Sequence, residues 1–487
     1  MKAYLMFKDK NFIVSKDGMF NYEVTLRDLE IQEVLNIMSI KDEFISAVCK
    51  ASLANPLFDL DTINYRQEVL RDCIKNTTIT RKLYSICEDI ENKIKKYLFG
   101  LRSTNLRNTY FTSLDYLSWY LEGLKELHDI AIKNKNQFSS KGFVDLFNLI
   151  EKELSDSYLN EVEKLINELK VRDDILISAH LGKSLISVDY TLRRIPKKFL
   201  GLSWIGKPAL KIKDDDEPAR KDFEHRKDLA INDAAMALSQ AAIHLGGFFN
   251  MLRTELAFYV GNLNFIDFAK ECNMPSTIPT LVLNSNSRSF AGLYDLALLY
   301  KKKSGIVSND CSVIDKNLYI VTGANQGGKT TFLRSFGQAQ LMAQAGMMVA
   351  AKEYTLPIRN SIFTHFKKEE DKKIKSGKLD EELERMSMIV DHIESPALVL
   401  FNESFASTNE REGSQINKDI TDALINAGNE VVSVSHLYTY TSSYFDNPNV
   451  AFLIAERKDD GSRSFKINEG MPKTTAYGFD LYKKVFG

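Results

Sequence analysis

The stretch Gly323-Ala324-Asn325-Gln326-Gly327-Gly328-Lys329-Thr330 is a complete P-loop signature, in which four residues separate two glycines and a Lys-Thr pair follows. Residues 318–322 form a short apolar run that predicts a buried strand, and residues 331–345 predict a helix that ends at Gly346. The signature therefore stands between a strand and a helix, where a helix N-terminus binds phosphate. This context favours a nucleotide phosphate site over a chance match in a loop.

The residue types of the loop suit such a site. Glycines let backbone N–H groups point toward the β- and γ-phosphates, while Lys329 adds a mobile positive charge. The hydroxyl of Thr330 is a suitable ligand for Mg²⁺. The loop therefore predicts a nucleotide with Mg²⁺, and the acidic strand described below makes ATP the expected nucleotide.

Length and composition limit the number of domains and the class of protein. The chain has 487 residues, which predicts two to four domains, and 44% hydrophobic with 26% charged residues is typical of a globular protein. Basic and acidic residues number 64 and 65, so no overall basicity indicates a nucleic-acid partner. Any contact with DNA must come from a local patch or channel.

The cysteines and the N-terminus indicate the compartment. Five cysteines are scattered without a Cys-x-x-Cys pair, which argues against a disulfide framework or a zinc site. Charged residues interrupt the N-terminus before a signal-like apolar run forms, and no run of 18 uncharged apolar residues exists. We therefore expect a cytoplasmic protein that neither spans a membrane nor is exported.

Three regions differ in their pattern. Residues 1–24 suggest a small hairpin, since apolar pairs alternate with charged and turn residues. Residues 25–273 read as amphipathic helices, with a strand-containing insertion at about 175–218. Residues 274–487 alternate strands with helices, which predicts a mostly parallel sheet flanked by helices. The expected strands of this last region are 278–283, 318–322, 347–351, 397–402, 430–436 and 450–455.

Residues 397–402 supply the acidic strand that an ATPase requires. The apolar run ends in Asn402 and Glu403, which a parallel sheet would place beside the P-loop. Glu403 is the candidate general base, although a strand-end carboxylate can also simply face solvent. Asn402 and Thr330 are the candidate Mg²⁺ ligands. Because an Asp is usual at position 402 and an amide oxygen carries no formal charge, slow hydrolysis is expected.

Residues 430–436 form a further apolar run that ends in His436. Beside the two earlier motifs, this histidine is a candidate sensor of the γ-phosphate and is assigned to the catalytic group. The alternative is an ordinary polar residue at the end of a strand.

Together these motifs resemble the ATPase domain of the MutS family, a branch of the ABC-type ATPases. The resemblance covers roughly residues 290–487 and is weaker upstream. It implies an α/β ABC-type P-loop ATPase domain at the C-terminus, preceded by a mainly helical core and lever domain with a small strand-containing insertion. The family's P-loop is matched by Gly323, Asn325, Gly327, Gly328, Lys329, Thr330 and Thr331. Further segments that resemble the family are Tyr294-Asp295-Leu296-Ala297-Leu298, Val307-Ser308-Asn309-Asp310, Ser361-Ile362-Phe363-Thr364-His365, Ser435-His436-Leu437-Tyr438 and Ala476-Tyr477-Gly478.

The resemblance also implies a homodimer, because in this family a signature loop of one subunit completes the ATP site of the other. Ser376 and Gly377 fall about where that loop is expected, and Ser376 is assigned to the cofactor-binding group. An ordinary surface loop is the alternative.

Two family features are missing from the pattern. The mismatch-reading wedge has the form Phe-x-Glu, and here that form occurs only as Phe401-Asn402-Glu403, within the acidic strand. No nuclease module is expected after the closing motif. The chain therefore resembles short MutS-like proteins built from core, lever and ATPase, and neither direct mismatch reading nor strand cutting is expected.

Three functions remain open. The first is a homodimeric, ATP-gated clamp on duplex, mismatched or branched DNA, acting in repair or recombination control. The second is an ATP-dependent switch that acts on a repair protein or a ribosome. The third is a scaffold that no longer hydrolyses ATP, motivated by Asn402. For the clamp, the candidate DNA contacts are Arg193, Arg194, Lys197 and Lys198, with Phe199 and Trp204 beside them; a solvated face is the alternative.

Overall fold

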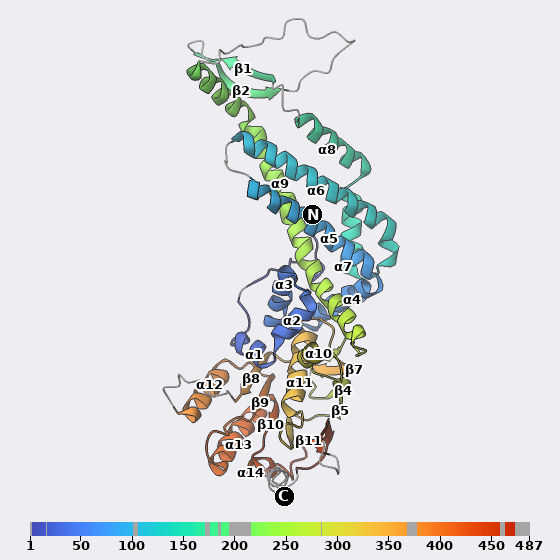
Figure 1. Cartoon of the computed structure of the whole chain (residues 1–487), viewed down its shortest axis with the longest axis vertical. Coiled ribbons are helices and arrows are strands. Elements are labelled where there is room, and N and C mark those ends of the chain that lie inside the picture. The colour runs from blue at the N-terminus through green and yellow to red at the C-terminus, as the bar shows by residue number, and fades with distance from the viewer. Residues whose placement is uncertain are drawn as a thin grey trace. The chain divides into compact units, whose positions relative to one another are not determined.

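A computed structural model describes residues 2–15, 17–100, 106–170, 176–183, 187–193, 216–283, 285–367, 377–457 and 463–472 (Figure 1). The chain forms two compact units. The helical unit comprises Met1–Ala3 and Thr78–Arg253, and the sheet unit comprises Tyr4–Thr77 and Thr254–Gly487. Residues 4–77, which the sequence analysis assigned to a hairpin and to the helical domain, thus group with the sheets. Among the described residues, no helix is long and apolar enough to cross a membrane.

The helical unit is built on long amphipathic helices. They are α5 (Thr77–Gly100), α6 (Leu106–Asn134), α7 (Lys141–Glu153), α8 (Asp156–Leu169) and the first part of the 55-residue helix α9 (Glu217–Glu271). At Gly123 of α6, a Cβ would lie 2.4 Å from Ile90 and 3.0 Å from Phe249, so a glycine lets α6 approach α5 and α9 closely. Tyr120 stacks on Phe249 at the same crossing, with 5.4 Å between ring centroids.

The insertion contains strands, as the sequence analysis predicted. Within its described residues, β1 (Leu176–Leu181) pairs antiparallel with β2 (Ser187–Arg193). Residues 184–186 and 194–215 lie outside the described part, and with them most of the candidate DNA contacts.

The main sheet of the sheet unit has six described strands in the order β12-β11-β6-β10-β9-β8. All neighbours from β11 to β8 pair in parallel, and β12 pairs antiparallel with β11. The predicted, mostly parallel sheet is thereby confirmed in this part of the chain. The strands are β6 (Leu318–Gly323), β8 (Ser361–Phe366), β9 (Ala397–Asn402), β10 (Glu430–Val434), β11 (Val450–Arg457) and β12 (Arg463–Glu469).

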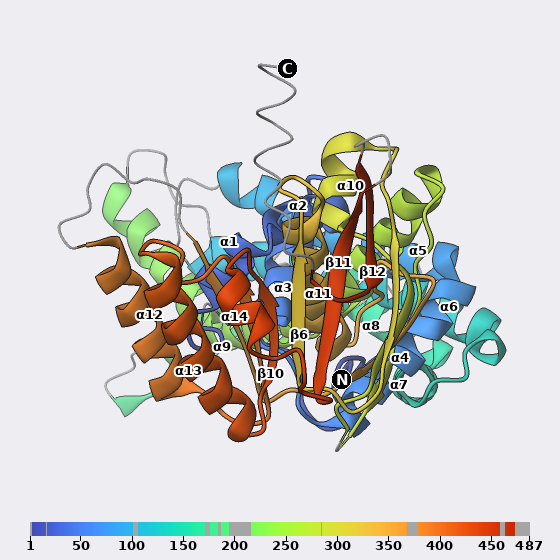
Figure 2. The ribbon, with the colours of Figure 1, turned by 90° about the horizontal axis from the view of Figure 1, so that it is seen from below.

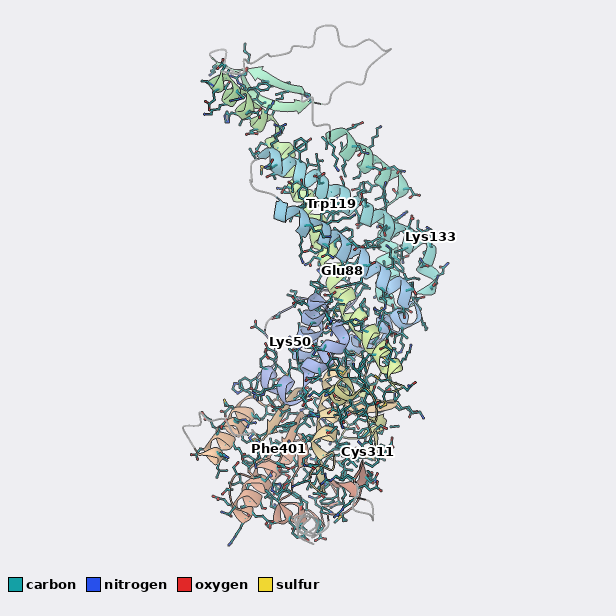
Figure 3. All side chains as sticks on the ribbon, in the orientation of Figure 1. Lys50, Glu88, Trp119, Lys133, Cys311 and Phe401 are labelled. Carbon is teal, nitrogen blue, oxygen red and sulfur yellow. The ribbon has the colours of Figure 1, made fainter. Side chains whose placement is uncertain are left out.

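Helices cover both faces of this sheet, which explains why its strands read as continuous apolar runs. On one face, Ile389 of α12 (Lys378–His392) and Leu424 of α13 (Glu410–Asn426) join the buried core cluster that contains Phe401. In Figure 2 α12 and α13 lie to the left of β10, with α12 the outer of the two, and Figure 3 labels Phe401 within the unit. On the other face, α11 (Lys329–Gln344) packs so closely that a Cβ at Gly337 would lie 2.7 Å from Leu400 of β9.

A second sheet contains four described strands in the order β3-β7-β4-β5. They are β3 (Thr280–Val282), β4 (Arg288–Leu293), β5 (Asn309–Val313) and β7 (Glu353–Pro357). The strand predicted at 347–351 is wrong, because this segment forms only an isolated bridge between Val349 and Thr277. Gly346 ends the turn after α11 with φ +80°, and the regular strand begins only at Glu353.

The N-terminal segment is not the predicted hairpin: no strand occurs among residues 2–15 and 17–21. Its backbone groups instead bind side chains of the sheet unit. The carboxylate of Glu255 accepts from the N–H groups of Leu5, Met6 and Phe12, and Tyr65 donates to the carbonyl of Tyr4. These side chains occupy the hydrogen-bonding groups that a partner strand would use.

The remaining helices of the sheet unit complete its packing. They are α1 (Tyr22–Asp28), α2 (Ile31–Ser39), α3 (Glu43–Ala54), α4 (Leu60–Lys75), α10 (Leu296–Lys302) and α14 (Tyr438–Ser442). The sequence predicted amphipathic helices from residue 25 onward, but the chain breaks between α1 and α2, where Glu30 has φ +52°.

A buried charge cluster links the two sheets. Glu430 at the start of β10 accepts from Arg288 of β4 through two hydrogen bonds of 3.0 and 2.9 Å. Arg359 donates a third at 2.8 Å, and all three side chains are at most 2% exposed. Arg288 also donates to Tyr354 and Gln340. The two guanidinium groups hold the pKa of Glu430 below its ordinary value, although burial acts in the opposite direction.

We expect Glu430→Gln to lower the free energy of unfolding by about 3–5 kcal/mol, because it leaves two buried guanidinium groups without a counter-charge. Glu23→Gln is the control, since it breaks an exposed pair with Lys50 and should cost less than about 1 kcal/mol. Denaturant unfolding measures both variants. Equal effects would contradict the role assigned to the cluster.

Candidate functional site

Three neighbouring strands end at one edge of the six-stranded sheet. Val434 of β10 pairs in parallel with Val321 of β6 and with Asn402 of β9. Parallel strands bring their carboxyl ends to the same edge. The residues that follow β6, β9 and β10 therefore gather at this edge, as expected from the sequence; Figure 2 labels β6 and β10.

The loop after β6 requires glycine at three positions. Gly323 has φ +117° and Gly328 has φ +94°, a region of backbone conformation that favours glycine. At Gly327, a Cβ would lie 2.9 Å from the carbonyl oxygen of Ala324 and 3.0 Å from Ala455. The loop therefore presents backbone rather than side chains at the start of α11. This helix begins at Lys329, two residues before the position expected from the sequence.

Lys329 lies inside the loop. Its ammonium group donates to the carbonyl oxygens of Gly323 at 2.9 Å and Ala324 at 3.1 Å, and the side chain is buried. Burial lowers the pKa of Lys329, while the nearby carboxylate of Glu403 acts in the opposite direction. Lys329 and Glu403 are thus electrostatic neighbours across the site.

Thr330 and Asn402 meet directly. The Thr330 hydroxyl donates to the Asn402 Oδ1 at 3.1 Å, which joins the first turn of α11 to the end of β9. Both are neutral oxygen ligands of the kind that Mg²⁺ accepts. The pair fits a Mg²⁺ site that takes further oxygens from a bound nucleotide. Among the described residues, no cluster of three or more His, Cys, Asp or Glu side chains forms a separate metal site.

Glu403 stands in a constrained turn directly after β9. It has φ +52°, and its N–H donates to the carbonyl of Val434 at 2.9 Å. Phe405, two residues later, has φ +58°. Non-glycine residues with positive φ are uncommon and concentrate at functional sites. The backbone therefore directs Glu403 away from the path of the strand.

The structure gives positions for only some of the remaining predicted site residues. β10 ends at Val434, so His436 follows the strand and is exposed at the same edge. Asn325 is exposed in the loop and Thr331 is half-buried in α11. Ser376 and the closing motif at 476–478 lie outside the described residues. The roles of His436 and Ser376 remain predictions.

Strand β12 brings two residues to the loop that the sequence analysis missed. Arg463 donates to the side chain of Gln326 at 2.7 Å, and a Cβ at Gly328 would lie 3.6 Å from the carbonyl oxygen of Phe465. The available signal was the Asp460-Gly461 dipeptide after β11, a pair typical of hairpin turns. Arg463 adds a second cation beside Lys329.

His365 of β8 is a further residue without an expected role. It is fully buried, one residue before the end of the strand, and its ring nitrogens contact Ser404 and the backbone of α12. Burial lowers the pKa of His365 to about 4, and the positive charge of Arg385 adds to this effect. The imidazole is therefore neutral at pH 7.

This burial predicts a pH dependence of stability. Because the pKa of His365 in the folded chain lies below its ordinary value of 6.5, the unfolded chain binds the proton more tightly. Stability should therefore fall as the pH drops from 6.5 toward 4, by about 2–3 kcal/mol from this group. We expect His365→Gln to remove that part of the change. Unfolding measured at pH 7 and pH 4.5, with exposed His392→Gln as the control, tests this; identical pH profiles in all proteins would refute it.

Two family models match the chain. The MutS2 N-terminal domain matches residues 58–271, and MutS domain V matches residues 319–485, which include the P-loop, Glu403 and His436. The two matches together cover most of the chain. The second match contains the whole of the candidate site described above.

Similar curated proteins have related names. A DNA mismatch repair protein MutS from Thermotoga neapolitana is 32% identical over 36% of this chain and 22% of its own length. An endonuclease MutS2 from Lactiplantibacillus plantarum is 30% identical over 34% of this chain and 22% of its own length. An endonuclease MutS2 from Streptococcus agalactiae is 24% identical over 76% of this chain and 48% of its own length. The chain thus spans between about a fifth and a half of these relatives, and with both domain models matched it belongs to the MutS family.

Proposed function

We propose that this chain is an ATP-dependent DNA-binding protein of the MutS type, in which slow ATP hydrolysis controls DNA binding. The observation that carries the proposal is the convergence of the P-loop, the Thr330–Asn402 pair and Glu403 at one edge of the parallel sheet.

For ATP binding, the loop N–H groups and Lys329 hold the β- and γ-phosphates, and Arg463 adds positive charge at the loop. Thr330 and Asn402 would hold Mg²⁺, which neutralises phosphate charge when bound. Glu403 acts as the general base that orients and deprotonates the attacking water. His436 stands at the same edge as a candidate γ-phosphate sensor.

Asn402 makes hydrolysis slow in this proposal. An amide oxygen holds a divalent cation more weakly than a carboxylate, because it has no formal charge. The hydrogen bond from Thr330 also occupies Asn402 Oδ1 in the present arrangement. The nucleotide-bound state is therefore long-lived compared with that of an enzyme with Asp at this position.

DNA is proposed as the partner because of the family and the printed names of the relatives, a DNA mismatch repair protein among them. In this proposal two chains form a homodimeric clamp, and Ser376 of one chain reaches the ATP of the other. The clamp binds duplex, mismatched or branched DNA through local basic groups. Arg193, at the end of β2, is exposed and bonds Ser178 at 2.8 Å.

A second candidate function keeps the ATPase and replaces DNA by a protein or a ribosome. The near-even charge balance favours it, since a formal net charge of −1 provides no general attraction to nucleic acid. In either case none of the five cysteines, all of them among the described residues, forms a disulfide bond, which suits a reducing compartment such as the cytoplasm.

ATP binding and turnover can be separated with two variants. Gly327→Ala places a methyl group against the Ala324 carbonyl and Ala455, so we expect at least about a tenfold loss of ATP affinity. Glu403→Gln should keep the ATP affinity and lose turnover by about 100-fold or more. Gly247→Ala is the control, since nothing lies within 4 Å of its Cβ position. Calorimetry and phosphate release give the two readouts; turnover that survives Glu403→Gln would contradict the assignment.

The DNA proposal is tested with the Glu403→Gln protein held with ATP and Mg²⁺. We expect binding to homoduplex, mismatched or branched DNA that weakens steeply with salt, since phosphate contacts release counterions. Arg193→Glu should weaken this binding, whereas Arg27→Glu, an exposed change in the sheet unit, should not. No binding to any of these DNAs in the presence of bound ATP would favour the protein or ribosome switch, which a pull-down in the same state would detect.

A further inference from the structure

His365 is a buried link between the turn that carries Glu403 and helix α12. It lies on β8, where it pairs in register with Phe401 of β9, the strand that leads to Glu403. Its ring stacks on Phe405 with 5.1 Å between centroids and an interplanar angle of 23°. The side chain is 0% exposed. It therefore touches the turn without facing solvent.

Hydrogen bonds from the ring reach both elements. Nδ1 lies 2.8 Å from the Ser404 hydroxyl, and Nε2 lies 3.0 Å from the carbonyl oxygen of Glu382 in α12. A carbonyl oxygen only accepts, so Nε2 carries the proton. In the neutral ring Nδ1 is then an acceptor. The Ser404 hydroxyl donates to Nδ1 or to the His365 carbonyl, which is 2.7 Å away. The hydrogen bond to the Glu382 carbonyl of α12 thus fixes the His365 tautomer, with the proton on Nε2.

The turn needs this support, because Glu403 and Phe405 both have positive φ. Other contacts hold its backbone, and the Phe405 side chain packs in the buried core cluster. Asn417 donates to the carbonyl of Ser404 at 3.2 Å, and Gly413 packs so tightly that a Cβ would lie 2.4 Å from the Phe405 carbonyl oxygen. The Ser404 side chain, adjacent to Glu403, is held by His365 alone among the described residues.

Helix α12 makes a second contact with the same region. Ser407 donates to the Glu382 carboxylate at 2.9 Å, and Glu382 is 5% exposed. The Glu382 carboxylate therefore binds Ser407 directly, while the Glu382 carbonyl binds the ring of His365, which in turn contacts Ser404. Any displacement of α12 at Glu382 changes the hydrogen bonds that hold the segment from Ser404 to Ser407.

We propose that His365 is a positioning residue that couples the position of α12 to the orientation of Glu403. This inference rests on the proposed ATP hydrolysis and adds a residue through which that site responds to a neighbouring helix. His365 does not touch the nucleotide in this proposal. It acts through Ser404, and the Nε2–Glu382 bond makes the support dependent on α12.

Two substitutions test the hydrogen bonds of the two ring nitrogens of His365 separately. His365→Asn places an amide oxygen near Nδ1 and keeps an acceptor for Ser404, but it does not reach Glu382. His365→Gln places an amide N–H near Nε2 and keeps the donor to Glu382, but it loses the side-chain partner of Ser404 at Nδ1 and leaves only the backbone carbonyl of residue 365. We expect each variant to reduce kcat by about 10- to 100-fold and to leave the ATP dissociation constant within about twofold, since no P-loop contact changes.

A second measurement detects the coupling between the ATP site and α12 without ATP hydrolysis. In the Glu403→Gln background, hydrogen–deuterium exchange of the α12 amides is compared with and without ATP. We expect ATP to change exchange in α12 when His365 is present and not in the His365→Asn protein. His392→Gln is the control on α12: His392 bonds Met388 within the helix and stacks on Phe20, but it does not contact the Glu403 turn in any described contact, so this variant should behave as the parent does.

The outcomes are distinct. Wild-type kcat in His365→Asn, or an unchanged α12 response in that variant, overturns the coupling. A parallel loss of ATP affinity, kcat and unfolding free energy in both variants would reduce His365 to a structural residue. If the parent chain neither binds nor hydrolyses ATP, the proposed function fails instead, and that result is visible before any His365 variant is made.

Discussion

The parallel pairing of β10 with both β6 and β9 is the constraint on which the rest of the site depends. Val434 stands in register with Val321 and with Asn402, so the P-loop, the Glu403 turn and His436 all emerge at one edge. Among the described residues, the hydrogen bond from Thr330 to Asn402 and the one from the Glu403 N–H to the Val434 carbonyl add to this pairing. Burial of β10 on both faces makes a shift in its register costly, since its five residues are all buried and a shift would misplace each of them.

The opposite end of β10 carries an ionic anchor. Glu430 starts the strand and binds Arg288 of the second sheet and Arg359 before β8. Buried ion pairs contribute little net stability compared with apolar packing, but losing one partner is costly. Any placement of the two sheets that separates Glu430 from Arg288 is therefore unfavourable. It lies at the end of the strand away from the nucleotide edge, so it supports the site without joining its chemistry.

At the nucleotide edge, opposite charges and neutral oxygens lie close together. Lys329 is buried beside the Glu403 carboxylate, while the proposed metal position has two neutral oxygens, those of Thr330 and Asn402. A site of this kind gains most of its affinity for a nucleotide from backbone N–H groups and cations. Its weakest element is the proposed set of cation ligands, and the proposal of slow hydrolysis rests on that weakness. The left-handed turn at Glu403 is the strained element, and neighbouring helices hold it.

The sequence by itself determined the local features whose cause is local. The 318–322 run, the glycines after it, and the 397–402 run became β6, the P-loop and β9 because apolar strands and glycine-rich turns require only their own residues. The sequence did not predict β4, β5, β12 or the helix break at Glu30, because packing against distant segments determines these features. The N-terminal segment was misread as a hairpin for the same reason: Glu255, some 250 residues away, binds its N–H groups. Only the tertiary structure could place His365 beside Ser404 and Arg463 beside Gln326, since these contacts join residues 39 and 137 positions apart, and no periodic pattern in a sequence records such distances.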